Sequence, residues 1–72
     1  MELRHIRYFK AVAEEKNFTR AAEKLAIAQP PLSRQIQDLE EELGTELFVR
    51  SPHKVTLTEE GELFLQYASQ IL

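Results

Sequence analysis

The residues with the clearest chemical potential lie at the start of one expected helix. Pro30 and Pro31 open the segment, and Ser33, Arg34 and Gln37 follow on the side away from its apolar residues. A guanidinium group can bond guanine twice or hold a phosphate, and hydroxyl and amide groups can bond base edges. The proline rings offer rigid apolar surface for a thymine methyl group. This set predicts contact with the major groove of duplex DNA; alternatively, the prolines only stiffen a helix start.

The charge of the chain is unevenly distributed around this segment. The 72 residues carry a net charge of −3, which by itself argues mildly against a nucleic-acid partner. Residues 16–37, however, hold four basic residues and one acidic residue, whereas residues 38–46 hold five acidic residues and no basic one. Local potential decides where a polyanion approaches. A duplex would be attracted to the first half of the segment and repelled by the second, unless these charges are simply solvated.

Apolar residues at three-to-four-residue spacing predict two helices before this segment. The first covers residues 3–16, and the second covers residues 18–25 with Asn17 as its N-cap. The expected inward residues are Leu3, Ile6, Phe9, Val12 and Ala13 in the first helix, and Phe18, Ala21, Ala22 and Leu25 in the second. Residues 26–28 then form a connection as short as the turn of a helix-turn-helix, although they lack the glycine often found there.

The third helix is expected over residues 30–43. Pro31 is its expected first helical residue, because a proline disfavours the helical conformation in the residue before it. Gly44 is the expected C-terminal cap. Its expected core side spans about 60° of the helix circumference and consists of Leu32, Ile36, Leu39 and Leu43.

A two-stranded wing is expected over residues 47–57. Residues 47–49 and 55–57 are β-prone, and the turn-rich segment between them carries Arg50, His53 and Lys54. Cations at the tip of a hairpin can lie along phosphates or over a minor groove. A metal site is not expected, because the only other histidine is His5 and no carboxylate–histidine pattern at ligand spacing is present.

The last expected helix, which follows the N-cap Thr58, is apolar over an unusually wide surface. Its apolar residues cover roughly 200° of the circumference. This width predicts pairing with a second copy of the chain, and we expect the helix to continue beyond residue 72. The alternative is a wide core helix in a monomer. The expected interface residues are Leu63, Phe64, Tyr67, Ala68, Ile71 and Leu72.

The composition limits the class of protein. The chain has no cysteine, no apolar run near the ~20 residues of a membrane span, and a charged N-terminus unlike a signal peptide, so we expect a cytoplasmic domain. Ser33 has no histidine nearby and no glycine-rich phosphate loop is present, so neither an enzyme nor a cofactor is expected. A protein-interaction module is the main alternative. In such a module the outward face of the third helix should be neutral or acidic along its whole length, whereas here its first half carries Arg34.

The order of residues resembles the N-terminal domain of LysR-type transcriptional regulators over essentially the whole chain. The resemblance rests on F-T-R-A-A-E-K-L at 18–25, Q-P-P-L-S-R-Q-I at 29–36, L-E-E-E-L-G at 39–44, L-F-V-R at 47–50 and L-T-E-E-G at 57–61. It implies a mainly α fold: a winged helix-turn-helix of three helices and a two-stranded wing over residues 1–57. Residues 58–72 would be the start of a truncated linker and dimerisation helix. A C-terminal effector-binding domain, absent from these residues, would bind any small-molecule effector.

The resemblance also implies roles for single residues. The implied base-reading residues are Gln29, Pro30, Pro31, Ser33 and Arg34. Thr19 and Arg20 match phosphate-contacting positions, and our reading of the residues adds Gln37, Arg50, His53 and Lys54. A homodimer is expected to read an interrupted palindrome in double-stranded DNA. Residues 51–53 differ from the more basic or glycine-containing wing tip common in the family. Residues 2–5 and the paired prolines resemble members that control the degradation of aromatic compounds.

Overall fold

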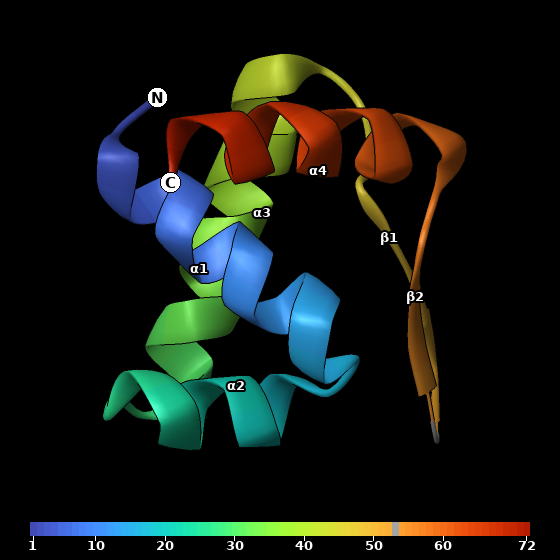
Figure 1. Cartoon of the computed structure of the whole chain (residues 1–72). Coiled ribbons are helices and arrows are strands. Elements are labelled where there is room, and N and C mark those ends of the chain that lie inside the picture. Colours follow the sequence, from blue (N-terminus) through green and yellow to red (C-terminus); the bar gives the residue numbers. More distant parts are fainter. Residues whose placement is uncertain (53) are drawn as a thin grey trace.

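The computed structural model describes residues 1–52 and 54–72 as helices packed around one core, with a hairpin at their side (Figure 1). In chain order the elements are α1 (Leu3–Glu15), α2 (Phe18–Leu25), α3 (Gln29–Leu43), β1 (Phe48–Ser51), β2 (Lys54–Leu57) and α4 (Glu59–Ile71). This arrangement confirms the predicted fold class, a mainly α winged helix-turn-helix followed by a further helix. The expected wing residue His53 lies outside the described residues.

The conformation at each end of α2 determines where this short helix lies. Asn17 Oδ1 accepts a hydrogen bond from the Arg20 backbone N–H at 2.8 Å, which confirms the predicted N-cap. At the other end Ala26 has a left-handed φ of 60°, and its N–H bonds to the Ala22 carbonyl. The chain thus makes the turn of the helix-turn-helix without the glycine that usually occupies a left-handed cap. Burial of Ala21 and Ala22 lets α2 pack closely on α1 and α3.

Helix α3 begins at Gln29, so the prediction that Pro31 is the first helical residue is wrong. Both prolines lie in the first turn, where backbone N–H groups have no acceptor within the helix and a missing N–H costs little. Burial of Leu32 and a hydrogen bond between the side chains of Gln29 and Ser33 hold this turn helical, against the preference of residues that precede proline. Gly44, with a φ of 72°, ends the helix as predicted.

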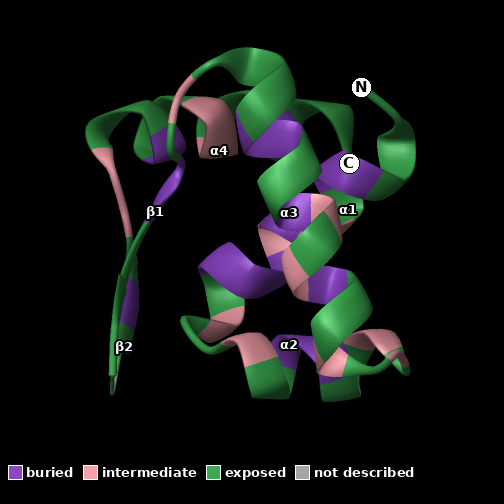
Figure 2. Cartoon of the chain, turned by 180° about the vertical axis from the view of Figure 1, so that it is seen from behind, coloured by how far each residue is buried: buried purple, intermediate pink, exposed green. Residues whose placement is uncertain are grey.

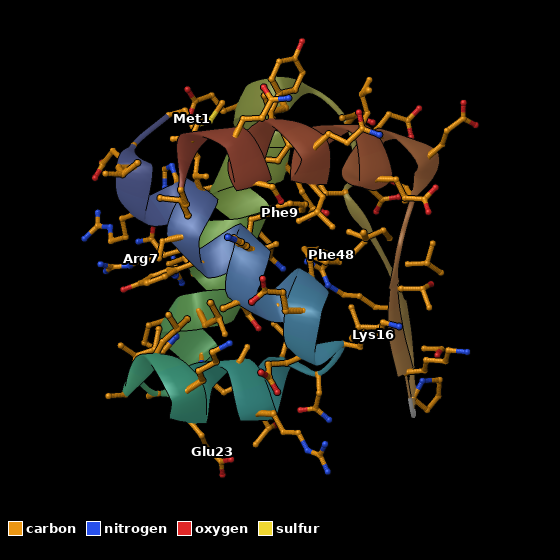
Figure 3. The ribbon with its side chains drawn as sticks, in the orientation of Figure 1. Met1, Arg7, Phe9, Lys16, Glu23 and Phe48 are labelled. Carbon is orange, nitrogen blue, oxygen red and sulfur yellow. The ribbon has the colours of Figure 1, made fainter. Side chains whose placement is uncertain are left out.

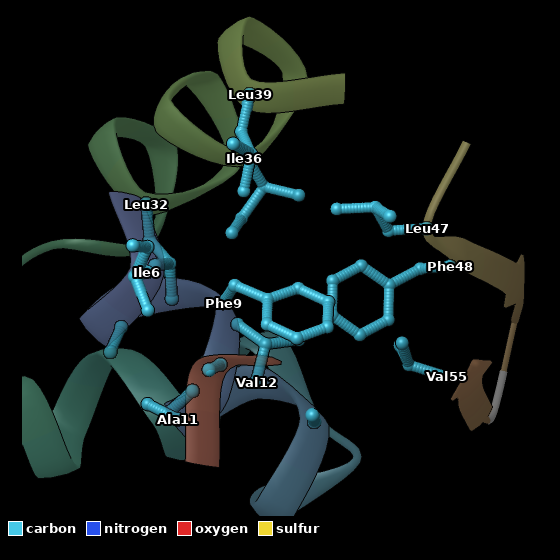
Figure 4. Close-up of a cluster of buried hydrophobic side chains, with 14 residues drawn as sticks. Ile6, Phe9, Ala11, Val12, Leu32, Ile36, Leu39, Leu47, Phe48 and Val55 are labelled. Carbon is cyan, nitrogen blue, oxygen red and sulfur yellow. The ribbon is translucent and has the colours of Figure 1, made fainter. Parts of the chain in front are cut away.

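Phe9 of α1 lies at the centre of the core and joins the helices to the hairpin (Figure 4). Its ring centroid is 5.2 Å from that of Phe48 in β1 and 4.9 Å from that of Phe64 in α4. Aromatic rings in tilted and edge-to-face pairs attract one another beyond their burial. Helix α3 covers the other side of this cluster through the fully buried residues Leu32, Ile36 and Leu39.

Two apolar residues at helix ends are exposed, contrary to the prediction that they belong to the core. Leu3 is 61% exposed and Leu43 is 36% exposed. Each lies in a terminal turn of its helix, whereas buried residues concentrate where the helices face one another (Figure 2). In the last turns of α3 the inward position is occupied instead by Glu40, which is only 8% exposed.

The wing is an antiparallel hairpin whose register decides which side chains face the helices. Phe48 pairs with Leu57 and Arg50 pairs with Val55, and these four residues share one face. Phe48 and Val55 are buried, so this is the inner face. The opposite face carries the two remaining pairs, which are Val49 with Thr56 and Ser51 with Lys54.

Helix α4 follows the hairpin directly and packs back onto α1. Thr58 is its N-cap, as predicted: its Oγ1 accepts from the Gly61 N–H at 2.9 Å and donates to the Glu46 carbonyl at 2.7 Å. Gly61 is required here, because a Cβ atom would overlap the Leu47 carbonyl oxygen. Among the described residues, no helix has both the length and the apolar character needed to cross a membrane.

Candidate nucleic-acid interface

Three elements bring exposed polar residues to one end of the molecule. Figures 1 and 2, which differ by a turn about the vertical axis, both place α2, the first turns of α3 and the far end of the hairpin at the lower end. Helix α4 and the last turns of α3 lie at the upper end in both views. Residues from three separate parts of the chain can therefore meet one extended ligand at the lower end.

The first turns of α3 present the predicted base-reading residues. Pro30, Pro31 and Arg34 are exposed, and Gln29 and Ser33 are half-buried. Gln29 Nε2 donates a hydrogen bond to Ser33 Oγ at 2.7 Å. This bond fixes the amide against the helix and leaves its carbonyl oxygen, one amide hydrogen and the Ser33 hydroxyl hydrogen for a ligand. The two side chains are thus oriented before any ligand arrives.

The charge on α3 changes from one end of the helix to the other, as the sequence predicted. Among the described residues, no carboxylate lies within ion-pairing distance of Arg34. The exposed Gln37 follows it, and the later turns carry Asp38 and Glu41 at the surface. An anionic ligand is therefore attracted to the first turns and repelled from the last ones.

A polar groove separates the start of α2 from the wing. It measures about 380 Å³ and is lined by Lys16, Asn17, Phe18, Thr19, Ser51, Pro52, Lys54 and Val55. Lys16 and Lys54 place cations at two sides of the groove, none of these lining residues is acidic, and Figure 3 shows Lys16 directed toward the hairpin. The structure thus brings the predicted phosphate-contact residues Thr19 and Lys54 together. Lys16 completes this set; its only signal in the sequence is its charge next to the N-cap Asn17.

The remaining cations of the predicted phosphate set differ in their surroundings. Arg20 is exposed on α2, with no acidic partner among the described residues. Arg50, by contrast, lies on the inner face of the hairpin. Its Nη2 is 3.2 Å from Glu40 Oε1, and its guanidinium lies 5.2 Å from the centroid of the Phe18 ring. Arg50 is therefore engaged with the helices rather than directed along the wing tip.

Glu40 is a buried residue whose contacts the sequence did not predict. It is one of the five acidic residues at 38–46, yet it is buried and accepts hydrogen bonds from the backbone N–H groups of Leu47 and Phe48. One signal was available, because Glu40 lies four residues after the buried Ile36 and so on the same side of the helix.

The residues predicted for a dimer interface divide into two groups. Ala68 is fully buried in the chain's own core and Phe64 is half-buried against Phe9, so Ala68 is a core residue instead. The other four are exposed by 48–61%. Three of them, spaced four residues apart, form an apolar stripe on α4, which we call the α4 stripe: Leu63, Tyr67 and Ile71. Leu72 follows the helix and lines a groove with residues of α1 and α2.

Comparison with known proteins identifies the family of this winged helix-turn-helix. Residues 3–62 match a family model described as "Bacterial regulatory helix-turn-helix protein, lysR family". The chain belongs to the LysR family. The family is one of regulatory proteins and not of enzymes, which agrees with the prediction from the sequence.

Curated relatives of this LysR-family domain are similar over its whole length. The transcriptional regulator BenM of Acinetobacter baylyi is 64% identical over 72 residues, the Hca operon activator HcaR of Escherichia coli K12 is 62% identical, and the regulator CatR of Pseudomonas putida is 60% identical. Each match covers 100% of this chain but only 24–25% of the relative. The chain thus spans about a quarter of the length of these proteins.

Solved structures of LysR-family domains have the same architecture. A crystal structure of the BenM DNA-binding domain with catB site 1 DNA matches with a TM-score of 0.96 and 63% identity, covering 99% of this chain and 79% of that one. A complex of the CbnR DNA-binding domain with DNA also gives a TM-score of 0.96, at 46% identity, covering 99% and 82% of the two chains. Both of those proteins were crystallised with DNA.

Proposed function

We propose that this LysR-family domain binds double-stranded DNA with sequence specificity, with the first turns of α3 in the major groove. The observation that carries the proposal is the meeting of exposed cations and oriented polar groups at one end of the molecule, away from the acidic turns of α3. Recognition helices of this motif enter the groove with their N-terminal residues. The DNA complexes of BenM and CbnR domains support the same use of the fold.

The proposed base readers are the residues at the start of α3. Arg34 donates two hydrogen bonds to guanine, and the amide of Gln29 pairs with adenine, the base that suits an amide. Ser33 holds Gln29 in place through the bond between their side chains and keeps its own hydrogen for a base edge. Pro30 and Pro31 pack against thymine methyl groups. In this proposal these contacts determine which DNA sequence the domain prefers.

The proposed phosphate contacts lie on both sides of the recognition helix. Arg20 and Thr19 hold the backbone at the start of α2, and Gln37 adds a contact from α3. Lys16 and Lys54 bind a phosphate at the groove between α2 and the wing, and the sequence adds His53 to the wing contacts. Such contacts fix the position of the protein on the duplex and supply most of the affinity.

We propose that two copies pair through the α4 stripe. A two-fold axis through the paired helices would place the two α3 helices in successive major grooves, about one helical turn of DNA apart. The three exposed apolar residues of the stripe support this pairing, since isolated apolar residues at a surface need no partner but a row of them along one side of a helix does. Further assembly and binding of an effector would then belong to the longer protein.

The longer protein is, in this proposal, a bacterial regulator of transcription that acts in the cytoplasm, where the chromosome lies. The resemblance of residues 2–5 and of the paired prolines extends the proposal to genes for the degradation of aromatic compounds. A footprint with genomic DNA fragments tests both points, because it identifies the site, its symmetry and the neighbouring genes. A protected interrupted palindrome is the expected result.

A titration with random duplex at low and high salt tests DNA binding itself. We expect binding that weakens steeply with salt, because released counterions drive the association. Binding that is indifferent to salt, or no binding at low salt, would overturn the proposal and favour a protein-interaction module. The acidic last turns of α3 are the feature that such a module would use.

A further inference from the structure

One buried carboxylate ties the wing to the recognition helix. Glu40 is 8% exposed, and both of its oxygens are occupied by residues 47–50. Its Oε2 accepts hydrogen bonds from the backbone N–H groups of Leu47 at 2.7 Å and Phe48 at 3.3 Å. Its Oε1 accepts a hydrogen bond from Arg50 Nη2 at 3.2 Å. The first residues of the hairpin are thus bonded to one side chain of α3.

Arg50 extends this attachment to α2. The register of the hairpin places it on the inner face with Phe48. Besides its bond to Glu40, its guanidinium lies over the ring of Phe18, 5.2 Å from the centroid. A cation over an aromatic face is attracted by the ring. One arginine therefore joins β1 to both helices of the helix-turn-helix.

The surroundings of Arg50 are unsuited to a phosphate. The groove beside it, about 410 Å³ in volume, is lined by Gln37, Glu40, Glu41, Gly44, Thr45, Glu46 and Arg50. It contains three carboxylates and a single cation, so its potential repels a polyanion. The groove at Lys16 and Lys54, near the tip of the hairpin, has cations and no carboxylate among its lining residues.

We propose that Glu40 and Arg50 are positioning residues for DNA binding. They fix the wing at one distance and angle from α3, so that Lys54 and the first turns of α3 contact the same duplex simultaneously. Arg50 acts through the wing and does not itself bind phosphate. This inference rests on the proposed function, and it adds two residues whose effect on DNA is indirect.

The salt dependence of DNA binding separates the two roles for Arg50. Each phosphate contact contributes about 0.9 to the slope of log K against log salt concentration. Lys54→Gln, on the outer face of the same hairpin, should reduce the slope by about that amount. Arg50→Gln should weaken binding and reduce the slope by no more than that amount, because it acts only through the contact of Lys54, and adding Lys54→Gln to it should reduce the slope no further. A double variant whose slope falls by the sum of two contacts, about 1.8, would assign Arg50 to a phosphate of its own and overturn the inference.

Amide hydrogen exchange tests the attachment in the protein without DNA. Glu40→Gln has the same shape but one oxygen fewer, so it cannot accept from the hairpin on both sides. The Leu47 and Phe48 amides should exchange at least tenfold faster in this variant. Glu41→Gln removes the same charge from an exposed neighbour that lines the same groove, and it should leave both amides protected. Unchanged protection in Glu40→Gln would overturn the inference.

Coupling between Glu40 and Lys54 shows whether the attachment serves DNA binding. The two residues are not bonded to each other, so they can influence each other only through the position of the wing. In the wild-type background Lys54→Gln should cost roughly 5- to 10-fold in affinity at 0.1 M salt. In the Glu40→Gln background it should cost less than twofold. An equal cost in both backgrounds would overturn the positioning role.

The outcomes also separate this inference from the proposed function. If the wild-type domain bound no duplex, the proposed function would fail, and the positioning role with it. If the wild type bound and only the coupling were absent, the positioning role alone would fail. Circular dichroism shows whether Glu40→Gln folds. If it does not, Arg50→Gln takes its place as the second background in which the cost of Lys54→Gln is measured, because Arg50→Gln leaves the buried carboxylate and its two backbone bonds in place.

Discussion

Arg34 is the residue on which base selection should depend most. It is exposed on the first turns of α3, and among the described residues no carboxylate competes for it. We expect Arg34→Ala to lose about 1–3 kcal/mol of binding free energy and to relax the preference at one base pair. Competition titrations with a set of single-base operator variants would measure both effects.

Arg4→Ala is the matched control for this substitution. Arg4 is also an exposed arginine, but it lies at the start of α1 and pairs with Glu2. Its removal should change neither affinity nor preference. A loss in Arg34→Ala that is uniform across all operator variants, with a shallower salt slope, would instead assign Arg34 to a phosphate.

The contrast between Arg34 and Arg50 shows what sequence could predict about single side chains. The outward direction of Arg34 follows from helical periodicity alone, because Leu32 and Ile36 fix the buried side of α3. Arg50 lies in a strand, where a residue's face depends on the pairing register and on which face packs against the helices. The sequence specifies neither the register nor the packed face, and the contacts of Arg50 with Glu40 and Phe18 in the structure establish both.

At the scale of elements, the two glycines of the chain are required for different physical reasons. Gly61 lies where a Cβ would overlap the backbone of Leu47, so Gly61→Ala must move α4 away from the wing. Gly44 has open space around it, but its φ is +72°. Urea unfolding should show a loss of about 3 kcal/mol for Gly61→Ala and about 1 kcal/mol for Gly44→Ala. Equal losses would mean that α4 and the wing are not held in contact.

The turn between α2 and α3 offers a stabilising substitution. Ala26 has a φ of 60°, which costs an L-residue about 1–2 kcal/mol and a glycine almost nothing. After the larger entropy of an unfolded glycine is subtracted, Ala26→Gly should raise the free energy of unfolding by about 0.5–1 kcal/mol. Ala26→Val, which adds a β-branched side chain at the same φ, should lower it. The same urea titrations would measure both variants.

Element boundaries were predictable where the signal is local. Asn17, Gly44 and Thr58 each act on backbone groups within three or four residues of themselves, so the residue type at each position was enough to predict the end of a helix. The left-handed Ala26 has no such signal, because packing of α2 against α3 imposes it. Leu3 and Leu43 were misplaced for the same reason: periodicity gives a direction but does not say whether another element covers that turn.

At the scale of the whole molecule, the two ends of the domain have opposite character. The lower end in Figure 1 carries α2, the first turns of α3 and the far end of the hairpin, where Arg20, Arg34 and Lys54 are exposed, and α4, with its apolar stripe, lies at the upper end. This separation lets one end bind DNA while the other pairs with a second copy. Affinity for a palindrome then depends on both ends, because a dimer brings two recognition helices to one site.

Tyr67, in the middle of the α4 stripe, offers a direct test of this division. It is 61% exposed, so Tyr67→Glu should leave the fold of the single chain intact. In a symmetric dimer the substitution removes two buried aromatic rings and places two carboxylates together. We expect the dimer dissociation constant to rise about 100-fold or more. Sedimentation at several concentrations measures this constant, and Gln66→Glu, an equal charge at an exposed neighbour, should change it little.

DNA binding by Tyr67→Glu tests whether the two ends act independently. The variant should bind a palindrome no better than a single half-site and keep its preference between half-site sequences, since α3 is unchanged. A wild-type domain that stays monomeric at every concentration would contradict the pairing. A Tyr67→Glu variant that lost its half-site preference would contradict the independence of the two ends.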